Sequence, residues 1–359
     1  MIFISYVIFM GLIILPALDY FLGLLILPTI KSSNEIDLVA PNALDGISAI
    51  IACHNEVNRI EQKVEELKTQ FAYAKVNKYE IIVISDGSDD GSNKILERLS
   101  NSGTIIYHLV SERKGKPNAI NEGVARSSFP ILLFSDVRQT FSKGAISYLL
   151  SNLSDPEVGA VTSQLELEGD ASPSRKIMNS LKLRESKKGS TTGVCGALYV
   201  IRRELVQPLP ENLILDDLMV ALFVMSMKKR VVLEPRAIVH DVSWDLFYSG
   251  RRQGRITAGI VQLLKSYRPL IFSIGLKQLI FLYGQKIMKY TVPILFTIAS
   301  FLAIFLSGVR AYHFGITTVI LILLIIWRPR FIGETIRLML SYMAQLLKLD
   351  KYKKIKWER

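Results

Sequence analysis

An apolar run that ends in an acidic turn decides how this chain is read: Glu80-Ile81-Ile82-Val83-Ile84-Ser85-Asp86-Gly87-Ser88. A second run of the same kind follows later: Pro130-Ile131-Leu132-Leu133-Phe134-Ser135-Asp136. Short apolar runs bounded by turn residues predict buried strands. Acids at the carboxyl ends of such strands in an open α/β sheet point into its ligand crevice. Asp86 and Asp136 therefore predict a ligand site at the carboxyl ends of the strands.

Strand and helix patterns alternate on both sides of these two runs. We expect strands at 47–52, 80–85, 104–110, 130–135 and 158–167, with a strand-like segment at 194–202 and short strands at 231–233 and 237–239. Helical spacing is expected at 56–71, 92–99, 116–125, 172–188 and 216–227. This alternation predicts an α/β fold, Rossmann-like, with a mostly parallel sheet covered on both faces.

The apolar content points to membrane segments. Of the 359 residues, 50% are hydrophobic, more than in a typical soluble enzyme. Met1–Ile30 contains one charged residue, Asp19, and exceeds the roughly 20 residues that a crossing needs. We expect an N-terminal transmembrane helix at 1–31 and a transmembrane hairpin at 289–328. The second arm of the hairpin is short, so a tilted or re-entrant form stays open. Asp19 is either paired within the bilayer or at its interface.

The net charge of +12 is concentrated toward the carboxyl end. Residues 328–359 contain nine Lys/Arg and three Asp/Glu, and basic residues beside membrane segments mark the cytoplasmic side. We expect a multi-pass protein of the inner or plasma membrane, with the catalytic domain at 46–255 and the carboxyl terminus in the cytoplasm. Residues 256–288 are expected to form interfacial amphipathic helices. The tail at 329–359 is expected to lie on anionic lipid as a basic amphipathic helix, so the lipid bilayer is an expected partner and nucleic acid is not.

Cysteine usage argues against a disulfide or a zinc site. Cys53 and Cys195 are the only cysteines, both in strand-like apolar contexts, and the chain has four scattered histidines without a CxxC motif. We expect both thiols to be small core residues in a reducing compartment.

Polar residues at the strand ends are candidates for a nucleotide site. Asn55 and Glu56 end the first strand and begin a helix, where they can hold a base or ribose or only cap the helix. Asp86 can accept hydrogen bonds from a ribose or a uracil, whereas Asp89 and Asp90 are expected to be turn and cap residues. Lys116 begins a helix whose amino terminus attracts phosphate.

A second group of residues suits group transfer from a diphosphate. Asp136 can hold Mg²⁺ or Mn²⁺ together with diphosphate oxygens and water. Asp216 and Asp217 are either a helix N-terminal acid pair or a pair in which one acid is a general base. The small-residue segment with Gly193 and Cys195 either admits an acceptor or forms a packing turn, and Asp216 is expected on the acceptor side with them. Three arginines about one helical turn apart can neutralise the leaving diphosphate or meet the membrane surface: Arg251, Arg252 and Arg255.

In their order along the chain, these motifs resemble inverting family 2 glycosyltransferases of the membrane-embedded, polysaccharide-synthase-like type with a GT-A fold. The resemblance covers residues 47–259. It rests on seven segments: Cys53-His54-Asn55-Glu56, Ser85-Asp86-Gly87-Ser88, Gly115 to Asn121, Ser135-Asp136-Val137-Arg138, Gly193 to Arg203, Asp216-Asp217, and Arg252-Gln253-Gly254-Arg255-Ile256.

The resemblance implies a role for each matched residue. Asp86 resembles the nucleotide-binding aspartate, Asp136 the metal-coordinating first acid of the DxD motif, and Asp217 the catalytic base. Arg252 and Arg255 resemble the polar members of the [QR]xxRW motif, which holds the donor diphosphate. The implied donor is a nucleotide-sugar, foremost a UDP-sugar, used with Mg²⁺ or Mn²⁺. The implied acceptor is a lipid-linked or growing glycan in envelope or exopolysaccharide synthesis, with synthase-complex partners open.

Two departures from the pattern leave alternatives. Arg138 replaces the second DxD acid, although its charge can help to neutralise phosphate, and Ile256 replaces a Trp that packs near the acceptor in processive synthases. Together they motivate a catalytically impaired scaffold subunit of a synthase complex as the alternative. A GT-A-like nucleotidyltransferase is the rival enzyme, but it would need neither the acid pair nor membrane attachment.

Overall fold

The computed structural model describes residues 45–168, 173–242 and 246–287. They belong to two compact units: 45–168, 173–242 and 269–275 lie in the larger one, and 246–268 and 276–287 lie in the smaller one. The expected transmembrane segments and basic tail fall outside the described residues. Within these residues, no helix is both long and apolar enough to cross a bilayer.

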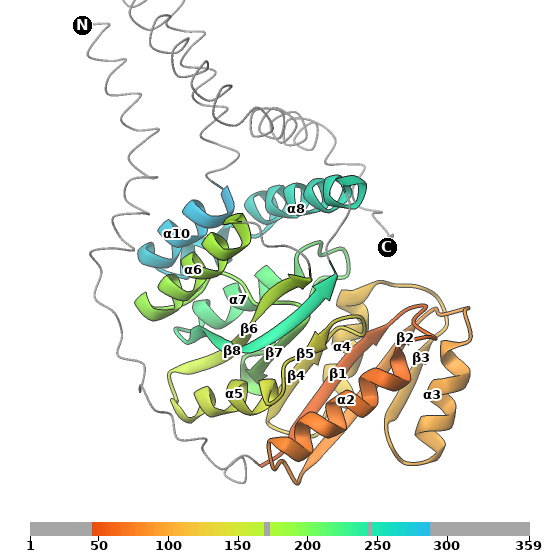
Figure 1. Ribbon diagram of the computed structural model, residues 1–359. Helices are drawn as coiled ribbons and strands as arrows, with labels where there is room; N and C mark the ends of the chain where they lie inside the picture. The colour runs from red at the N-terminus through yellow and green to blue at the C-terminus, as the bar shows by residue number, and fades with distance from the viewer. Residues whose placement is uncertain (1–44, 169–172, 243–245, 288–359) are drawn as a thin grey trace, which may run out of the picture. The chain divides into compact units, whose positions relative to one another are not determined.

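The larger unit is built on an eight-stranded sheet with the order β3-β2-β1-β4-β7-β6-β8-β5 (Figure 1). Strands β1 to β4 form one parallel block, and β8 pairs in parallel with β6. Strand β7 is antiparallel to both β4 and β6, and β5 is antiparallel to β8. The strands are β1 (Ile47–Cys53), β2 (Tyr79–Asp86), β3 (Ile106–Val110), β4 (Ile131–Ser135), β5 (Thr140–Phe141), β6 (Val158–Glu168), β7 (Leu198–Arg202) and β8 (Arg230–Val242). This mixed, mostly parallel sheet confirms the α/β, GT-A-like fold.

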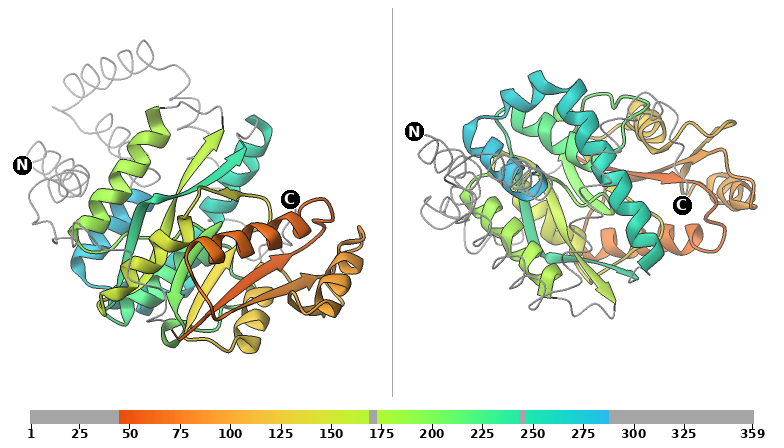
Figure 2. Two further views of the ribbon diagram at one scale, coloured as in Figure 1. Left: turned by 60° about the horizontal axis from the view of Figure 1, so that its bottom comes forward. Right: turned by 90° about the horizontal axis from the view of Figure 1, so that it is seen from above.

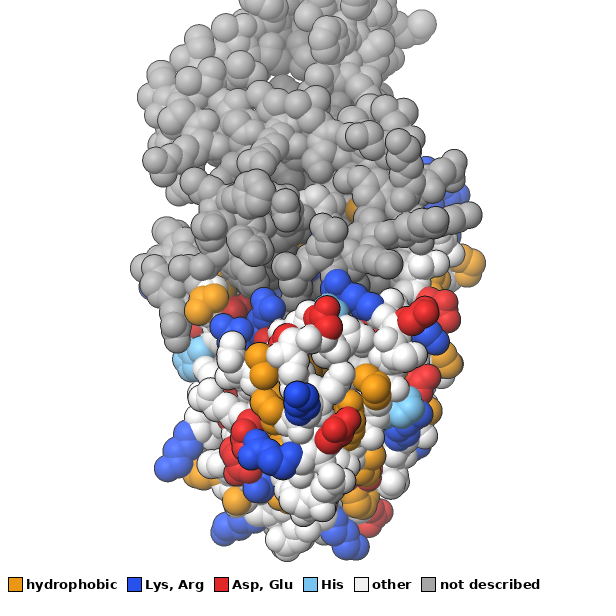
Figure 3. Space-filling view, turned by 90° about the vertical axis from the view of Figure 1, so that its right-hand side faces the viewer, with side chains coloured by type: hydrophobic (Ala, Val, Ile, Leu, Met, Phe, Trp, Pro, Cys, Tyr) orange, Lys and Arg blue, Asp and Glu red, His pale blue; other side chains and the backbone are white. Residues whose placement is uncertain are grey.

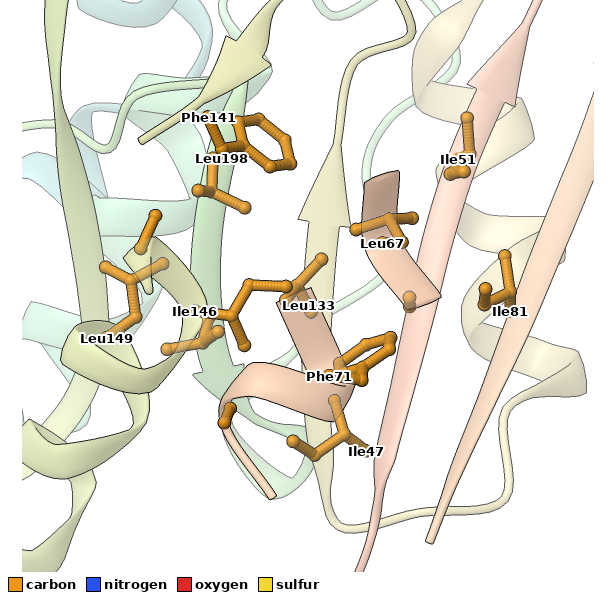
Figure 4. Close-up of a cluster of buried hydrophobic side chains, with 14 of the residues drawn as sticks. Ile47, Ile51, Leu67, Phe71, Ile81, Leu133, Phe141, Ile146, Leu149 and Leu198 are labelled. Atoms are coloured by element: carbon orange, nitrogen blue, oxygen red, sulfur yellow. The ribbon is translucent and has the colours of Figure 1, made fainter. Parts of the chain in front are cut away.

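Helices pack on both faces of the sheet (Figures 1 and 2). They are α2 (Ile60–Tyr73), α3 (Ser92–Asn101), α4 (Lys116–Arg126), α5 (Ala145–Ser151), α6 (Pro173–Lys188) and α7 (Asp216–Ser226). On one face, strand residues such as Ile51 and Leu133 join α2 and α5 in the main hydrophobic cluster, which Figure 4 shows. On the other face, Ile82 and Ile84 pack against Ala119 of α4. This alternation follows from the two-residue period of a strand, which sends successive side chains to opposite faces.

Some elements differ from the sequence-based expectation. The two short strands expected at 231–233 and 237–239 are one strand, β8, with an irregularity where Ser163 pairs with Glu234 and Gln164 with Ile238. Pro235 lies within it, and the backbone N–H of Arg236 donates to the Glu234 carboxylate at 3.0 Å, which accounts for the interrupted pattern. The short elements β5 and α5 were not predicted.

The smaller unit contains mainly helical residues. Helix α8 (Leu246–Ser266) runs through residue 255, where the predicted catalytic domain ends, and α10 (Leu276–Leu282) continues into a π-helical turn, η4 (Tyr283–Ile287). Helix α9 (Arg268–Ser273) lies almost wholly in the range of the larger unit. The interfacial role of these helices stays a prediction.

The edge strand β3 exposes apolar side chains, with Ile106 41% and Leu109 45% exposed. Figure 3 shows the face at the right of Figure 1, where hydrophobic side chains are scattered between acidic and basic ones. Scattered apolar residues of this kind are ordinary for a protein surface.

Strand direction determines which loops meet. Because β1, β2 and β4 are parallel and in register, their carboxyl ends lie side by side, with Cys53 opposite Ser85 and Ile51 opposite Ser135. Strand β7 runs the other way, so its first residue, Leu198, pairs with Ser135. The loop before β7 therefore meets the loop after β4.

Helix α4 lies close against the sheet at Gly123. A Cβ atom there would lie 2.4 Å from Cγ2 of Ile50. We expect Gly123→Ala to lower the free energy of unfolding by about 1–3 kcal/mol, although alanine is the better helix former by about 1 kcal/mol in an exposed helix. Denaturant or thermal unfolding of the full chain measures this. In an Ile50→Ala background, Gly123→Ala should change the free energy of unfolding little. An equal loss of stability in both backgrounds would show that the clash with Ile50 is not its cause.

Candidate active site

A lysine ammonium lies between two carboxylates at the carboxyl end of β4. Nζ of Lys116 is 2.8 Å from Oδ1 of Asp136 and 3.4 Å from Oδ2 of Asp216. It also donates to the carbonyl oxygen of Gly196 at 3.4 Å. The side chains are mostly buried: Lys116 is 14%, Asp136 16% and Asp216 10% exposed. Three residues predicted from separate motifs thus form one cluster.

The loop before β7 connects this cluster to the start of α7. The backbone N–H of Asp136 donates to the Ala197 carbonyl at 3.1 Å, and that of Val194 donates to the Asp217 carbonyl at 3.2 Å. A Cβ atom on Gly196 would lie 3.6 Å from Nζ of Lys116 and 3.7 Å from Cβ of Asp217. These are ordinary contact distances, so Asp217 adjoins the cluster.

Of the three predicted acceptor-side residues, Gly193 and Cys195 lie in the same loop, and Asp216 is the first residue of α7. The backbone N–H of Cys195 donates to Oγ1 of Thr162 at 2.6 Å, and Gly193 directly precedes Val194. This bond helps to fix the backbone of the loop. Its predicted contact with an acceptor stays a prediction.

Asp86 holds the loop that leads into α4. Its buried carboxylate accepts from the backbone N–H groups of Lys114 and Gly115, each at 2.7 Å. Gly87, at φ 65°, supports the same loop, because a Cβ atom there would lie 2.7 Å from the backbone N of Arg113. Asp86 therefore positions the backbone just before Lys116.

The loops after β1 and β2 are joined by polar bonds. Asn55, at φ 53°, donates from Nδ2 to Oδ1 of Asp89 at 2.8 Å and accepts from the Asp89 backbone N–H at 3.0 Å. His54 lies 2.7 Å from the carbonyl oxygen of Asp86 through Nδ1. A carbonyl oxygen only accepts, so Nδ1 is the protonated nitrogen in this contact. Asn55 thus fixes the loop after β1 to the loop after β2, and its predicted contact with a nucleotide stays a prediction.

Arg138, which replaces the second DxD acid, is bound to Glu56. Its Nε donates to Oε1 of Glu56 at 2.6 Å, and the Glu56 side chain is 1% exposed. The backbone N–H of Glu56 donates to Oγ of Ser92 at 2.9 Å. A buried carboxylate needs a charged or hydrogen-bonding partner, and Arg138 supplies one from 82 residues along the chain.

Asp89 and Asp90 lie in the turn between β2 and α3, and the N-cap residue of α3 is Gly91. Asp90 accepts from the backbone N–H of Ser92 at 2.9 Å and of Val57 at 3.0 Å. Burial raises the pKa of the Asp90 carboxyl, but hydrogen bonds from Ser92 and the Val57 backbone outweigh it, so the pKa lies below its ordinary value.

Tyr199, whose hydroxyl interacts electrostatically with the acids of the cluster, was not singled out by the sequence analysis. It is fully buried on β7, and its ring stacks on Phe134 with centroids 4.8 Å apart. Burial, and then the charge of Asp216, raise the pKa of its hydroxyl well above the ordinary value. No local pattern marks this tyrosine, because its neighbours come from the pairing of β4 with β7.

Both cysteines are buried and free, as predicted. Burial, and then the charge of Glu56, raise the pKa of the Cys53 thiol to about 12. At neutral pH this thiol is therefore protonated.

The cluster suits a divalent cation that shares its ligands with a diphosphate. Within the described residues, no three His, Cys, Asp or Glu side chains are arranged to hold a metal ion by themselves. Asp136 and Asp216 already hold the positive charge of Lys116. Oxygen ligands of this kind fit Mg²⁺ or Mn²⁺, which take one or two carboxylates together with substrate phosphates.

The predicted arginines lie in α8, in the smaller unit. Arg255 is partly buried, whereas the side chain of Arg252 is outside the described part of the chain. Their predicted contact with the donor diphosphate stays a prediction.

Residues 48–209 match the family model described as glycosyl transferase family 2. Poly-beta-1,6-N-acetyl-D-glucosamine synthase of Staphylococcus aureus is 25% identical over 207 residues, covering 54% of this chain and 49% of that protein. The synthase of the same name from Staphylococcus epidermidis is 23% identical over the same length. The chain thus spans about half the length of the curated relatives it matches.

A solved structure shares the fold over nearly the whole chain. It is a mannosyltransferase from Pyrobaculum calidifontis in complex with GDP-Man and Mn²⁺, with a TM-score of 0.69 and 20% sequence identity. The match covers 96% of this chain and 97% of that one.

The stability of the loop before α4 should depend on the hydrogen bonds that both carboxylate oxygens of Asp86 accept. In Asp86→Asn the amide NH₂ faces one of the two N–H donors, so at least one buried, charge-assisted hydrogen bond is lost. We expect a loss of about 1.5–3 kcal/mol in the free energy of unfolding, measured by denaturant unfolding. The exposed Asp89→Asn is the matched control and should lose less than about 1 kcal/mol. Equal losses would contradict the special role of Asp86.

Glu56 pairs with two arginines, and the pair with Arg138 should contribute more to the free energy of unfolding than the pair with Arg59. Arg59 lies 3.6 Å from Glu56, and its side chain is 56% exposed. We expect Arg138→Ala to lower the free energy of unfolding by about 1–2 kcal/mol, because it removes the close partner of a buried carboxylate. Arg59→Ala should cost less than about 0.5 kcal/mol. Thermal unfolding of the two variants side by side measures the difference, and the reverse order would refute it.

Proposed function

Since this chain belongs to glycosyl transferase family 2, we propose that it is a membrane-bound inverting transferase that uses a nucleotide-sugar, foremost a UDP-sugar. The proposed acceptor is a lipid-linked or growing glycan of envelope or exopolysaccharide synthesis. The observation that carries this proposal is the cluster of Lys116, Asp136 and Asp216, with Asp217 beside it.

The cluster has the charges that transfer from a diphosphate requires. Lys116 begins α4, where the helix amino terminus and the ammonium together favour phosphate. Asp136 follows β4 and offers a carboxylate beside it. A divalent cation, when bound there, supplies positive charge to the leaving diphosphate.

Asp217 is the proposed general base. Its Oδ1 accepts from the Leu218 backbone N–H at 2.9 Å, which orients the carboxylate. In the proposed reaction Asp217 takes the proton of an acceptor hydroxyl, whose oxygen bonds to C1 of the donor sugar. The bond from C1 to the diphosphate oxygen breaks with its electron pair on the diphosphate. Because attack and departure are on opposite sides of C1, the anomeric configuration inverts.

The relatives support the acceptor class. The staphylococcal proteins are named as synthases of a poly-N-acetylglucosamine, which favours a glycan acceptor for this chain. The mannosyltransferase from Pyrobaculum calidifontis is in complex with GDP-Man and Mn²⁺, so both UDP- and GDP-sugars belong in a donor screen. Arg252 and Arg255 are proposed to neutralise the diphosphate.

Attachment to the inner or plasma membrane is part of the proposal. It is supported by the apolar segment Met1–Ile30, by the two apolar segments at 290–307 and 312–327, and by the basic tail. With the amino terminus outside, this arrangement puts the catalytic domain and the carboxyl terminus in the cytoplasm, where nucleotide-sugars are used.

Replacement of the proposed base tests the function directly. Detergent-purified full-length protein is supplied with a panel of UDP- and GDP-sugars, Mg²⁺ or Mn²⁺, and membrane lipid extract as acceptor. We expect nucleotide release with one donor, and a loss of at least 100-fold in kcat for Asp217→Asn, as removal of a general base costs about 10²–10⁴-fold.

The exposed Glu97→Gln on α3 removes the same charge away from the cluster and should retain full activity. Activity that survives in Asp217→Asn would assign the base elsewhere. Nucleotide binding without release, with every donor and acceptor extract, would favour the scaffold alternative.

A further inference from the structure

The ammonium of Lys116 already has the surroundings of a bound cation. Two carboxylate oxygens and one carbonyl oxygen face Nζ: Oδ1 of Asp136 at 2.8 Å, Oδ2 of Asp216 at 3.4 Å and the carbonyl of Gly196 at 3.4 Å. These groups come from three segments of the chain that are distant in sequence. The protein's own side chain thus places one positive charge between these carboxylates.

The position of this ammonium is well defined. Lys116 is the first residue of α4, and the backbone just before it is held by the carboxylate of Asp86. At the other end of the side chain, Nζ donates to the carbonyl oxygen of Gly196 at 3.4 Å. The ammonium is thus held both through the backbone at the start of its own side chain and by the oxygen atoms around Nζ.

A second cation at Asp136 would meet electrostatic repulsion from Lys116. Like charges at short range repel strongly where the protein lowers the effective dielectric constant below that of water. The residue that would offset this repulsion in the DxD pattern is an acid, but here it is Arg138, whose Nε is bound to Glu56 at 2.6 Å. A divalent ion alone therefore competes with the ammonium of Lys116 for the carboxylates of Asp136 and Asp216.

We infer that Lys116 is the resident cation of the donor-free site, that it excludes free divalent metal, and that the metal enters only as its complex with the nucleoside diphosphate. The inference rests on the proposed function and adds the order in which the ligands bind. The diphosphate brings negative charge, which both attracts the ammonium away from Asp136 and supplies the oxygen ligands that the protein lacks. Lys116 is thus a positioning residue that couples cation binding to donor binding.

Direct Mn²⁺ binding tests this without any turnover. Full-length protein in detergent is titrated with Mn²⁺ in the absence of nucleotide, and free Mn²⁺ is followed by its electron paramagnetic resonance signal. We expect Lys116→Met to bind Mn²⁺ at least tenfold more tightly than the unmodified protein. A gain in affinity separates this role from a structural one, because damage to the fold lowers affinity.

Matched variants assign the gain to this site. Lys114→Met removes a charge from the same loop at an exposed side chain and should leave Mn²⁺ binding unchanged. Lys116→Arg keeps the positive charge and should keep the weak binding. Adding Asp136→Asn to Lys116→Met should abolish the gain. Equal Mn²⁺ affinity in Lys116→Met and the unmodified protein overturns the inference.

A second measurement keeps the test independent of whether Lys116→Met folds. In the unmodified protein we expect Mn²⁺ to bind at least tenfold more tightly with saturating UDP or GDP than without nucleotide. If the unmodified protein transfers sugar but binds Mn²⁺ equally tightly without nucleotide, the inference about Lys116 is wrong and the proposed function stands. A failure to bind either nucleotide counts against the proposed function itself.

Discussion

The placement of one ammonium between two carboxylates organises this site. Lys116, Asp136 and Asp216 belong to a helix start, a strand end and a second helix start, and they meet because β4 ends where the antiparallel β7 begins. Acids crowded at a mostly buried position repel one another unless a cation lies between them. The lysine lowers that penalty and, by the same contacts, holds the segment after β4 next to the start of α7.

The remaining polar residues of the crevice serve mainly to shape loops. Asp86 uses both carboxylate oxygens on backbone N–H groups, and Asn55 forms a two-point pair with Asp89. Loops over an open sheet have few apolar contacts, so hydrogen bonds to short side chains fix their conformation. A motif residue can therefore be indispensable to a site by fixing the backbone, before any contact with a ligand is considered.

Arg138 shows how a departure from a family pattern can be compensated. An arginine in place of a metal-binding acid removes a carboxylate from the crevice, yet it pairs with the buried Glu56. The substitution thus gives a buried charge its partner and leaves Asp136 as the acid nearest to the ammonium. Within the described residues, no three acidic, histidine or cysteine side chains converge to hold a cation by themselves, which agrees with our inference that a cation arrives with its own anionic ligands.

The sequence by itself determined the α/β class, most elements of the sheet and the acids at its carboxyl ends, because strand periodicity and turn chemistry are local properties. It also identified Lys116, Asp136, Asp216 and Asp217 as candidates. Only the tertiary structure decided which of them touch, since the contact of Lys116 with Asp136 spans 20 residues and that of Arg138 with Glu56 spans 82. Strand order and direction bring these pairs together, and no local pattern in a single sequence encodes which strand lies beside which.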